Sequence, residues 1–398
     1  MGIRGIAVHR VVSMKQWSSI VAASLFLPVA FSICVAAQAV SPADAIALEQ
    51  QGKLPEAAEA WKAVTDRNPN DAAAFASLGV VFSKLQKYDQ AASAYRKALK
   101  LNPKLPGIEL NLGLAEFKQG HFRSASAALR QALAADPSST QAKTLLGLSY
   151  YGSRQFSEAA ISLSPVAAND PANTELHRVL AQSCLWARKF SCAQEEFRRI
   201  LEQNPDSSAA HVLLGEALDG LGRTEEAIVE FEAAAKISPR EPEVHFGLGY
   251  LHWKSHQYDE AKQEFERELS LDSSHAQSLA YLGDIEWKNN HPDAALSFLN
   301  RAKKINDSLR IVYVDLGAIY MYQKNYKEAQ VVLHRAVALD PAKPDAHYQL
   351  GRLYQALGNT ADAEKELHKV QELHKEAEDS LVGKISSAPP ALNPSGDR

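Results

Sequence analysis

A 34-residue period constrains this chain more than any other feature of its sequence. A repeat of this length is one supersecondary unit that cannot bury its apolar face alone, so neighbouring units must stack on one another. The chain of 398 residues is therefore predicted to form one elongated array rather than two or three globular domains. The clearest marker is an alanine that returns in ten successive units without an insertion, at Ala57, Ala91, Ala125, Ala159, Ala193, Ala227, Ala261, Ala295, Ala329 and Ala363.

Two further markers keep the same phase and predict that each unit is a pair of antiparallel helices. A Leu-Gly pair such as Leu78-Gly79 precedes the alanine in eight units, and a closing proline such as Pro103 ends seven. Small residues allow two helices to approach closely, so Gly79 and Ala91 are expected where the helices cross, with Tyr95 filling the space further out. Glycine or asparagine is expected in the turn, and the proline ends the second helix.

The 34-residue pattern resembles that of the tetratricopeptide repeat family. In the second unit the matching residues are Phe75, Leu78, Gly79, Phe82, Tyr88, Ala91, Tyr95, Ala98 and Pro103. The resemblance implies an all-α, right-handed α-solenoid of ten helix-turn-helix repeats over residues 38–377, with the first helix of each hairpin lining a concave face that holds peptides or proteins. The units are 38–71, 72–105, 106–139, 140–173, 174–207, 208–241, 242–275, 276–309, 310–343 and 344–377.

The two ends of the chain depart from the repeat. Residues 1–39 have the layout of a signal peptide, in which Arg4, Arg10 and Lys15 precede an uncharged run over residues 20–37 and a small-residue site at Ala37-Gln38-Ala39. This predicts an exported protein, periplasmic or secreted. The alternative is an uncleaved membrane anchor through residues 20–37, because 18 apolar residues can just span a bilayer. Residues 378–398 are predicted to be a disordered tail.

Lysines and large aromatic side chains mark the predicted concave face. Lys84 and Lys118 are 34 residues apart, as are Lys254 and Lys288, which predicts a ladder of positive charge suited to an acidic segment of a partner. Aromatic side chains with polar edges are typical of binding hot spots, although these rings are alternatively expected to pack between adjacent hairpins. They concentrate in repeats seven to ten, and with Met321 the set is Phe246, Tyr250, Trp253, Tyr281, Trp287, Tyr322 and Tyr348.

Histidines and cysteines offer two further candidate sites. His252 and His256 have the spacing of metal ligands on one helix, but His256 falls in a turn and other histidines share one repeat position, which indicates packing. No metal or other cofactor is predicted. Cys184 and Cys192 lie on one hairpin, where an exported protein would be able to form a disulfide. The alternative is that they are two small apolar packing residues.

Charge and motifs narrow the class of function. The net charge is −4 and becomes −4 − 3 = −7 without the three basic residues of the leader, which excludes a general nucleic-acid binder. No nucleotide-binding loop or nucleophile elbow is present, so the chain is predicted not to be an enzyme. The favoured interpretation is a scaffold or adaptor that binds a peptide or protein in the cell envelope or outside the cell, with membrane association only if the leader is uncleaved. A periplasmic subunit of a polysaccharide or protein export machine is the alternative, and an enzyme-associated targeting module is a third interpretation.

Overall fold

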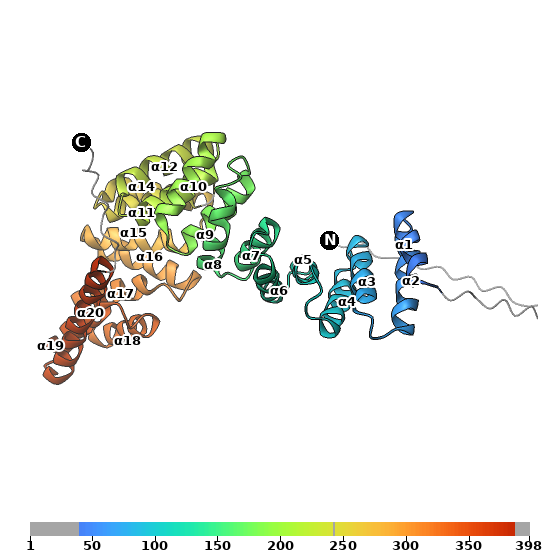
Figure 1. Cartoon of the computed structure of the whole chain (residues 1–398). Coiled ribbons are helices and arrows are strands. Elements are labelled where there is room, and N and C mark those ends of the chain that lie inside the picture. The colour runs from blue at the N-terminus through green and yellow to red at the C-terminus, as the bar shows by residue number, and fades with distance from the viewer. Residues whose placement is uncertain (1–39, 242, 387–398) are drawn as a thin grey trace, which may run out of the picture.

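The structure is a computed structural model that describes residues 40–241 and 243–386. Over these residues the chain forms twenty helices and no strand, and consecutive helices pack as hairpins in an elongated array with α1 and α2 at one end and α19 and α20 at the other (Figure 1). The predicted all-α solenoid of repeats is confirmed. The helices are α1 (Pro42–Gln50), α2 (Leu54–Arg67), α3 (Ala72–Lys84), α4 (Tyr88–Leu101), α5 (Ile108–Lys118), α6 (Phe122–Ala135), α7 (Thr140–Gly152), α8 (Phe156–Ala167), α9 (Thr174–Trp186), α10 (Phe190–Gln203), α11 (Ser208–Gly220), α12 (Thr224–Ile237), α13 (Val244–Lys254), α14 (Tyr258–Leu271), α15 (Ala276–Lys288), α16 (Pro292–Ile305), α17 (Arg310–Tyr322), α18 (Tyr326–Leu339), α19 (Pro344–Ala356) and α20 (Thr360–Ser386).

Eight of the ten described hairpin cores are built around a contact between a glycine and a large residue 16 positions later. A Cβ atom added to Gly79 would lie 2.5 Å from Cε1 of Tyr95, so the ring lies directly against the glycine and not further out as the sequence suggested. Ala91 is fully buried beside this contact. The same arrangement recurs at Gly113 with Leu129, Gly147 with Leu163, Gly215 with Phe231, Gly249 with Phe265, Gly283 with Leu299, Gly317 with Leu333, and Gly351 with Leu367.

The turn inside each hairpin contains one residue in the left-handed region, and these residues are again 34 apart. Glycine occupies the position at Gly52, Gly120, Gly222 and Gly358, as glycine has no Cβ to clash there. The expectation of glycine or asparagine was too narrow, because other residue types take the same conformation at a conformational cost. The remaining positions are Gln86 (φ 59°), Arg154 (φ 61°), Arg188 (φ 58°), His256 (φ 61°), Asn290 (φ 62°) and Lys324 (φ 60°).

Histidines at one repeat position link three parts of the array. His211 Nδ1 lies 2.6 Å from Glu230 Oε2 on the second helix of the same hairpin, and its Nε2 lies 3.0 Å from the carbonyl oxygen of Pro205, which closes the preceding repeat. His245 and His347 make the corresponding contacts, and His177 contacts Glu196 at 2.5 Å. The prediction that these histidines are packing residues is confirmed, with hydrogen bonds as part of the packing.

The C-terminal helix is longer than the repeat requires. The predicted tail began at residue 378, but α20 continues to Ser386, so residues 378–386 are helical and the prediction for them was wrong. Leu367 and Leu373 pack toward the array, whereas most side chains of α20 before residue 380 are exposed. Residues 387–398 and the predicted leader, 1–39, lie outside the described residues. None of the described helices combines the length and the apolar character that crossing a membrane requires.

Candidate partner-binding surface

The first helices of the hairpins form one side of the array, which we call the inner surface. Successive first helices, such as α13, α15 and α17, contact one another from hairpin to hairpin, whereas successive second helices meet at most weakly. The array therefore curves toward its first helices. Side chains that project from α11 to α19 on this side are available for contacts outside the hairpin cores.

The predicted lysine ladder is not a row of free positive charges. Lys84 Nζ lies 3.1 Å from Glu49 Oε2, and Lys254 Nζ lies 2.6 Å from Asp219 Oδ1. In both pairs the acid stands 35 residues before the lysine, so a lysine near the end of a first helix reaches back to the preceding hairpin. These contacts neutralise the charge that was expected to attract an acidic partner.

The other two lysines differ from each other. Lys288 pairs with Asp284 one turn earlier on α15, and its Nζ lies 5.2 Å from the centre of the Trp253 ring. Lys118 is exposed and makes no ion pair within the part of the chain that the structure describes. Of the four lysines only Lys118 is unpaired among the described residues, so the expected ladder of free positive charge is corrected, while the charge of the partner stays a prediction.

Four of the predicted aromatic residues form a cluster between α13 and α15. Tyr281 lies 4.9 Å from Trp253, 5.7 Å from Tyr250 and 6.1 Å from Phe246, measured between ring centres. Trp253 Nε1 donates a hydrogen bond of 2.5 Å to Asp284 Oδ2. For Trp253 the alternative interpretation holds, because its ring packs between adjacent hairpins.

One carboxylate and one tyrosine hydroxyl at this cluster have a raised pKa. Asp315 is buried on α17, and its Oδ2 has no hydrogen-bond partner among the described residues. Burial raises the pKa of Asp315 well above its usual range, and the negative charge of Asp284 adds to the effect. Burial likewise raises the pKa of Tyr281 to about 12, so its hydroxyl stays neutral. Asp284 and Asp315 are therefore buried carboxylates beneath the inner surface at α15 and α17.

A hollow of about 530 Å³ between α15, α17 and α19 contains several predicted site residues, and we call it the aromatic pocket. Trp287, Met321 and Tyr322 line it, together with Gln349 and Arg352. Trp287 and Tyr322 meet edge to face at 5.7 Å, and Tyr322 remains 63% exposed. Tyr348 is also 48% exposed, with the Arg352 guanidinium 5.9 Å from its ring centre. These rings are open to a partner.

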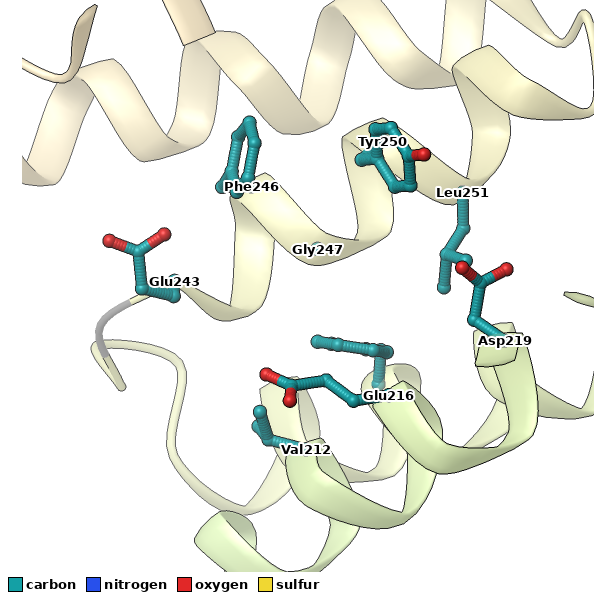
Figure 2. A pocket seen from close by; sticks show the side chains of 9 residues that line it. Val212, Glu216, Asp219, Glu243, Phe246, Gly247, Tyr250 and Leu251 are labelled. Carbon is teal, nitrogen blue, oxygen red and sulfur yellow. The ribbon is translucent and has the colours of Figure 1, made fainter. Parts of the chain in front are cut away.

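A second hollow, of about 280 Å³, lies between α11 and α13, and we call it the acidic pocket (Figure 2). Phe246 and Tyr250 line it from α13, while Glu216 and Asp219 line it from α11. Glu243 stands at the start of α13, where Figure 2 shows it beside the same space. The pocket therefore combines aromatic walls with three carboxylates.

Sequence reasoning overlooked Glu216 and Asp219, although a signal was present. Glu216 stands 34 residues before Tyr250, and Asp219 stands 34 before Trp253, so both occupy positions already assigned to the concave face. Trp186 was overlooked for the same reason, since it shares the repeat position of Lys118 and Lys254. Its ring stacks on Tyr151 at 5.7 Å and is 48% exposed. The repeat positions of the predicted lysines and aromatic residues, followed through every hairpin, indicate all three of these residues.

The cysteines and the remaining histidines complete the candidate sites. Cys184 and Cys192 are joined by a disulfide that links α9 to α10, the bridged alternative of the two left open by the sequence. His252 Nδ1 lies 2.7 Å from Gln257 Oε1, and His256 Nδ1 lies 2.9 Å from the hydroxyl of Tyr258. Over residues 40–241 and 243–386, no group of three or more His, Cys, Asp or Glu side chains is arranged to hold a metal ion.

Comparison with family profiles identifies the class of protein that this fold represents. One tetratricopeptide repeat profile matches residues 84–149, 117–183, 220–268 and 320–382, and a second matches 43–106, 178–242 and 246–309. Together they match residues 43–382 except 310–319. The chain belongs to the tetratricopeptide repeat family. Proteins with this fold are typically non-catalytic scaffolds for protein interactions.

Solved structures support the same fold. The chain is similar to one described as the APC/C hetero-tetramer Cut9-Hcn1, with a TM-score of 0.50 and 15% identity over 83% of this chain and 80% of that one. It is also similar to a tetratricopeptide repeat protein from Parabacteroides merdae, with a TM-score of 0.50 and 17% identity over 62% of this chain and 97% of that one. At these identities the likeness concerns the fold alone. A comparison with curated proteins gives no match.

Proposed function

We propose that this protein is a scaffold that holds a peptide or protein partner on the inner surface of its later hairpins, from α11 to α19. The observation that carries the proposal is the exposed aromatic surface around the aromatic pocket, above all Tyr322, which is 63% exposed. Large rings with polar edges bury much area at little entropic cost, and they dominate the energy of protein interfaces. The hairpin cores do not need Tyr322 or Tyr348.

We further propose that the scaffold works outside the cytoplasm, in the periplasm or as a secreted protein. The leader-like pattern over residues 1–39 supports this location. The disulfide between Cys184 and Cys192 supports it independently, because such bonds persist in oxidising compartments. The mature protein is expected to begin after Ala37 or Ala39 and to contain no free thiol. Intact mass and thiol titration of protein from the cell envelope test both expectations, and a full-length chain with three free thiols would contradict them.

Crosslinking in intact cell envelopes tests the binding surface. The native chain is compared with a Tyr322→Ala, Tyr348→Ala double variant, whose exposed rings can be removed with little effect on the core. A matched control removes two exposed apolar side chains of second helices, Val229→Ala and Val331→Ala, which are 61% and 68% exposed. We expect a specific crosslinked partner with the native chain and the control, and its loss with the tyrosine variant. Equal crosslinking by all three proteins would refute the proposed surface.

A further inference from the structure

The acidic pocket carries more negative charge than its own residues neutralise. Lys254 pairs with Asp219 at 2.6 Å, and His275 Nε2 lies 3.4 Å from Glu243 Oε1. Glu216 makes no ion pair and no side-chain hydrogen bond within the described chain. Its side chain is open to solvent but stands in a concavity with protein around it. This partial burial raises the pKa of Glu216, and the negative charge of Glu243 raises it further.

The walls of the pocket are apolar and aromatic. A Cβ atom added to Gly247 would lie 2.2 Å from Cε1 of Phe231, so this ring packs against the backbone of α13 at the base of the pocket. Figure 2 shows Phe246 and Tyr250 on α13, with the carboxylate of Glu216 on α11 directed toward the side of the pocket where Val212 and Glu243 lie. The long stems of lysine and arginine pack along apolar surfaces of this kind, and aromatic faces attract a cation.

The size of the pocket and the charge around it restrict the occupant further. A cavity of about 280 Å³ lies just below the range of roughly 300 to 1,000 Å³ that is usual for small-molecule sites, so one side chain fits better than a larger ligand. Further along the inner surface Asp284 and Asp315 are buried, and Asp284 pairs with Lys288, so the open carboxylates are those of the pocket. At the pocket itself, three carboxylates therefore stand beside one lysine, Lys254, which already pairs with Asp219.

From this complementarity we infer that the acidic pocket binds an arginine or lysine side chain of the partner polypeptide. The cationic head lies between Glu216 and Glu243, and its stem lies along Phe246 and Tyr250. This inference rests on the proposed function and adds the chemistry of the partner, a segment with a basic residue instead of the acidic segment that the sequence suggested.

Ligand-observed saturation-transfer NMR on the full chain tests the inference with defined probes. The probes are N-acetyl-arginine amide, N-acetyl-lysine amide and N-acetyl-citrulline amide, the last of which has nearly the shape of arginine without its charge. We expect saturation transfer to the two cationic probes and about threefold to fivefold weaker binding of citrulline, the range for ion pairs that remain partly exposed. Equal binding of arginine and citrulline would overturn the inference.

Two variants locate the binding. Glu216→Gln removes the charge of the pocket carboxylate while keeping its shape, and it should weaken the arginine probe about threefold to fivefold. The matched control is Glu232→Gln, an exposed glutamate of α12 outside the pocket, which should leave binding unchanged. Circular dichroism melting curves should be the same for both variants and the native chain. An unchanged affinity in Glu216→Gln, or an equal loss in Glu232→Gln, would place the charge recognition elsewhere and overturn the assignment.

The inference and the proposed function fail in different ways. If the crosslinked partner depends on Tyr322 and Tyr348 but the arginine probe does not bind, the scaffold proposal stands and the acidic pocket has no basic ligand. If the arginine probe binds through Glu216 but crosslinking is the same in the tyrosine variant, the pocket stands and the proposed surface is wrong.

Discussion

The first four hairpins and the last five share one core but present different inner surfaces. In the third repeat Gly113 packs against Leu129, and in the seventh Gly249 packs against Phe265 in the same way. At the repeat position of Phe246 the early hairpins carry Ala76, Leu110 and Thr144, and at that of Tyr250 they carry aliphatic residues. The position of Trp253 is aromatic in both regions, with Phe117 and Tyr151 in the early one. The contacts between the two helices of a hairpin do not depend on the inner positions, so the residue types there differ between hairpins.

Both regions hold a paired buried carboxylate at the same repeat position, and they differ at Asp315. In the later region Glu286 is buried and pairs with Lys262 and His291. In the early region Glu116 is buried, but it pairs with Arg96 and lies 3.0 Å from His121 Nδ1. In the later region Asp315 is buried with one oxygen unpartnered. A buried carboxylate that is paired stabilises the fold, and one without partners destabilises it. The later region thus contains one buried carboxylate, Asp315, whose charge the surrounding packing does not satisfy.

The largest expected effect tests whether the hairpin core is the same in both regions. Gly113→Ala would bring a Cβ atom 2.5 Å from Leu129 Cγ, and Gly249→Ala would bring one 2.6 Å from Phe265 Cδ1. Overpacking a close helix crossing costs about 3 kcal/mol, the upper end of its usual range, so we expect a similar loss of stability from each variant. Thermal melting gives the size of the loss, and hydrogen exchange shows which hairpins open. A much smaller loss at one site would show that the two regions do not share a core.

The disulfide lies in the fifth hairpin, between the two regions. Cys184 and Cys192 are 8 residues apart, and closing so short a loop lowers the entropy of the unfolded chain enough to stabilise by about 2.5 kcal/mol. A reductant should therefore lower the melting temperature of the native chain. The Cys184→Ala, Cys192→Ala variant serves as the control and should not respond to the reductant. An equal response in both proteins would show that the bridge does not support the hairpin.

Asp315 and Glu116 allow the contrast between the regions to be measured by pH. Because the folded-state pKa of Asp315 is raised, its contribution to stability is present below the usual pKa of 3.8 and is lost as the pH rises through the folded value. Asp315→Asn removes the buried charge, so we expect it to raise the free energy of unfolding at pH 7 by about 1 to 2 kcal/mol and to reduce the loss of stability with rising pH. Chemical denaturation at several pH values measures both effects.

The matched change in the early region should act in the opposite direction. Glu116→Gln breaks the ion pair with Arg96 and is expected to lower the free energy of unfolding at pH 7 by about 1 to 2 kcal/mol. If both variants lower the stability, the unpartnered oxygen of Asp315 contributes no penalty, and this contrast between the two regions is wrong.

The sequence predicted the fold well because the repeat and the packing obey the same spacing. Alanine at Ala91 and glycine at Gly79 report directly on the helix crossing, so the period was enough to place each hairpin. The candidate site was harder to predict, because the charge of Lys254 is paired with Asp219, 35 positions earlier in the chain. The two residues come into contact only when neighbouring hairpins stack. A single repeat position does not show whether its charge is paired with the neighbouring repeat.

The turns give the smallest expected effect, and they test whether the hairpins differ in conformational strain. Lys324 is exposed with φ 60°, and Gly358 occupies the same turn position one repeat later with φ 75° and no atom within 4 Å of a Cβ built on it. Lys324→Gly relieves a left-handed conformation but adds freedom to the unfolded chain, so we expect a net gain of about 0.5 to 1 kcal/mol. Gly358→Ala should lose a similar amount, because space is available and only the backbone conformation opposes the change. If the melting temperatures of both variants move in the same direction, side-chain contacts, and not the backbone conformation, determine the effect of the turn residue on stability.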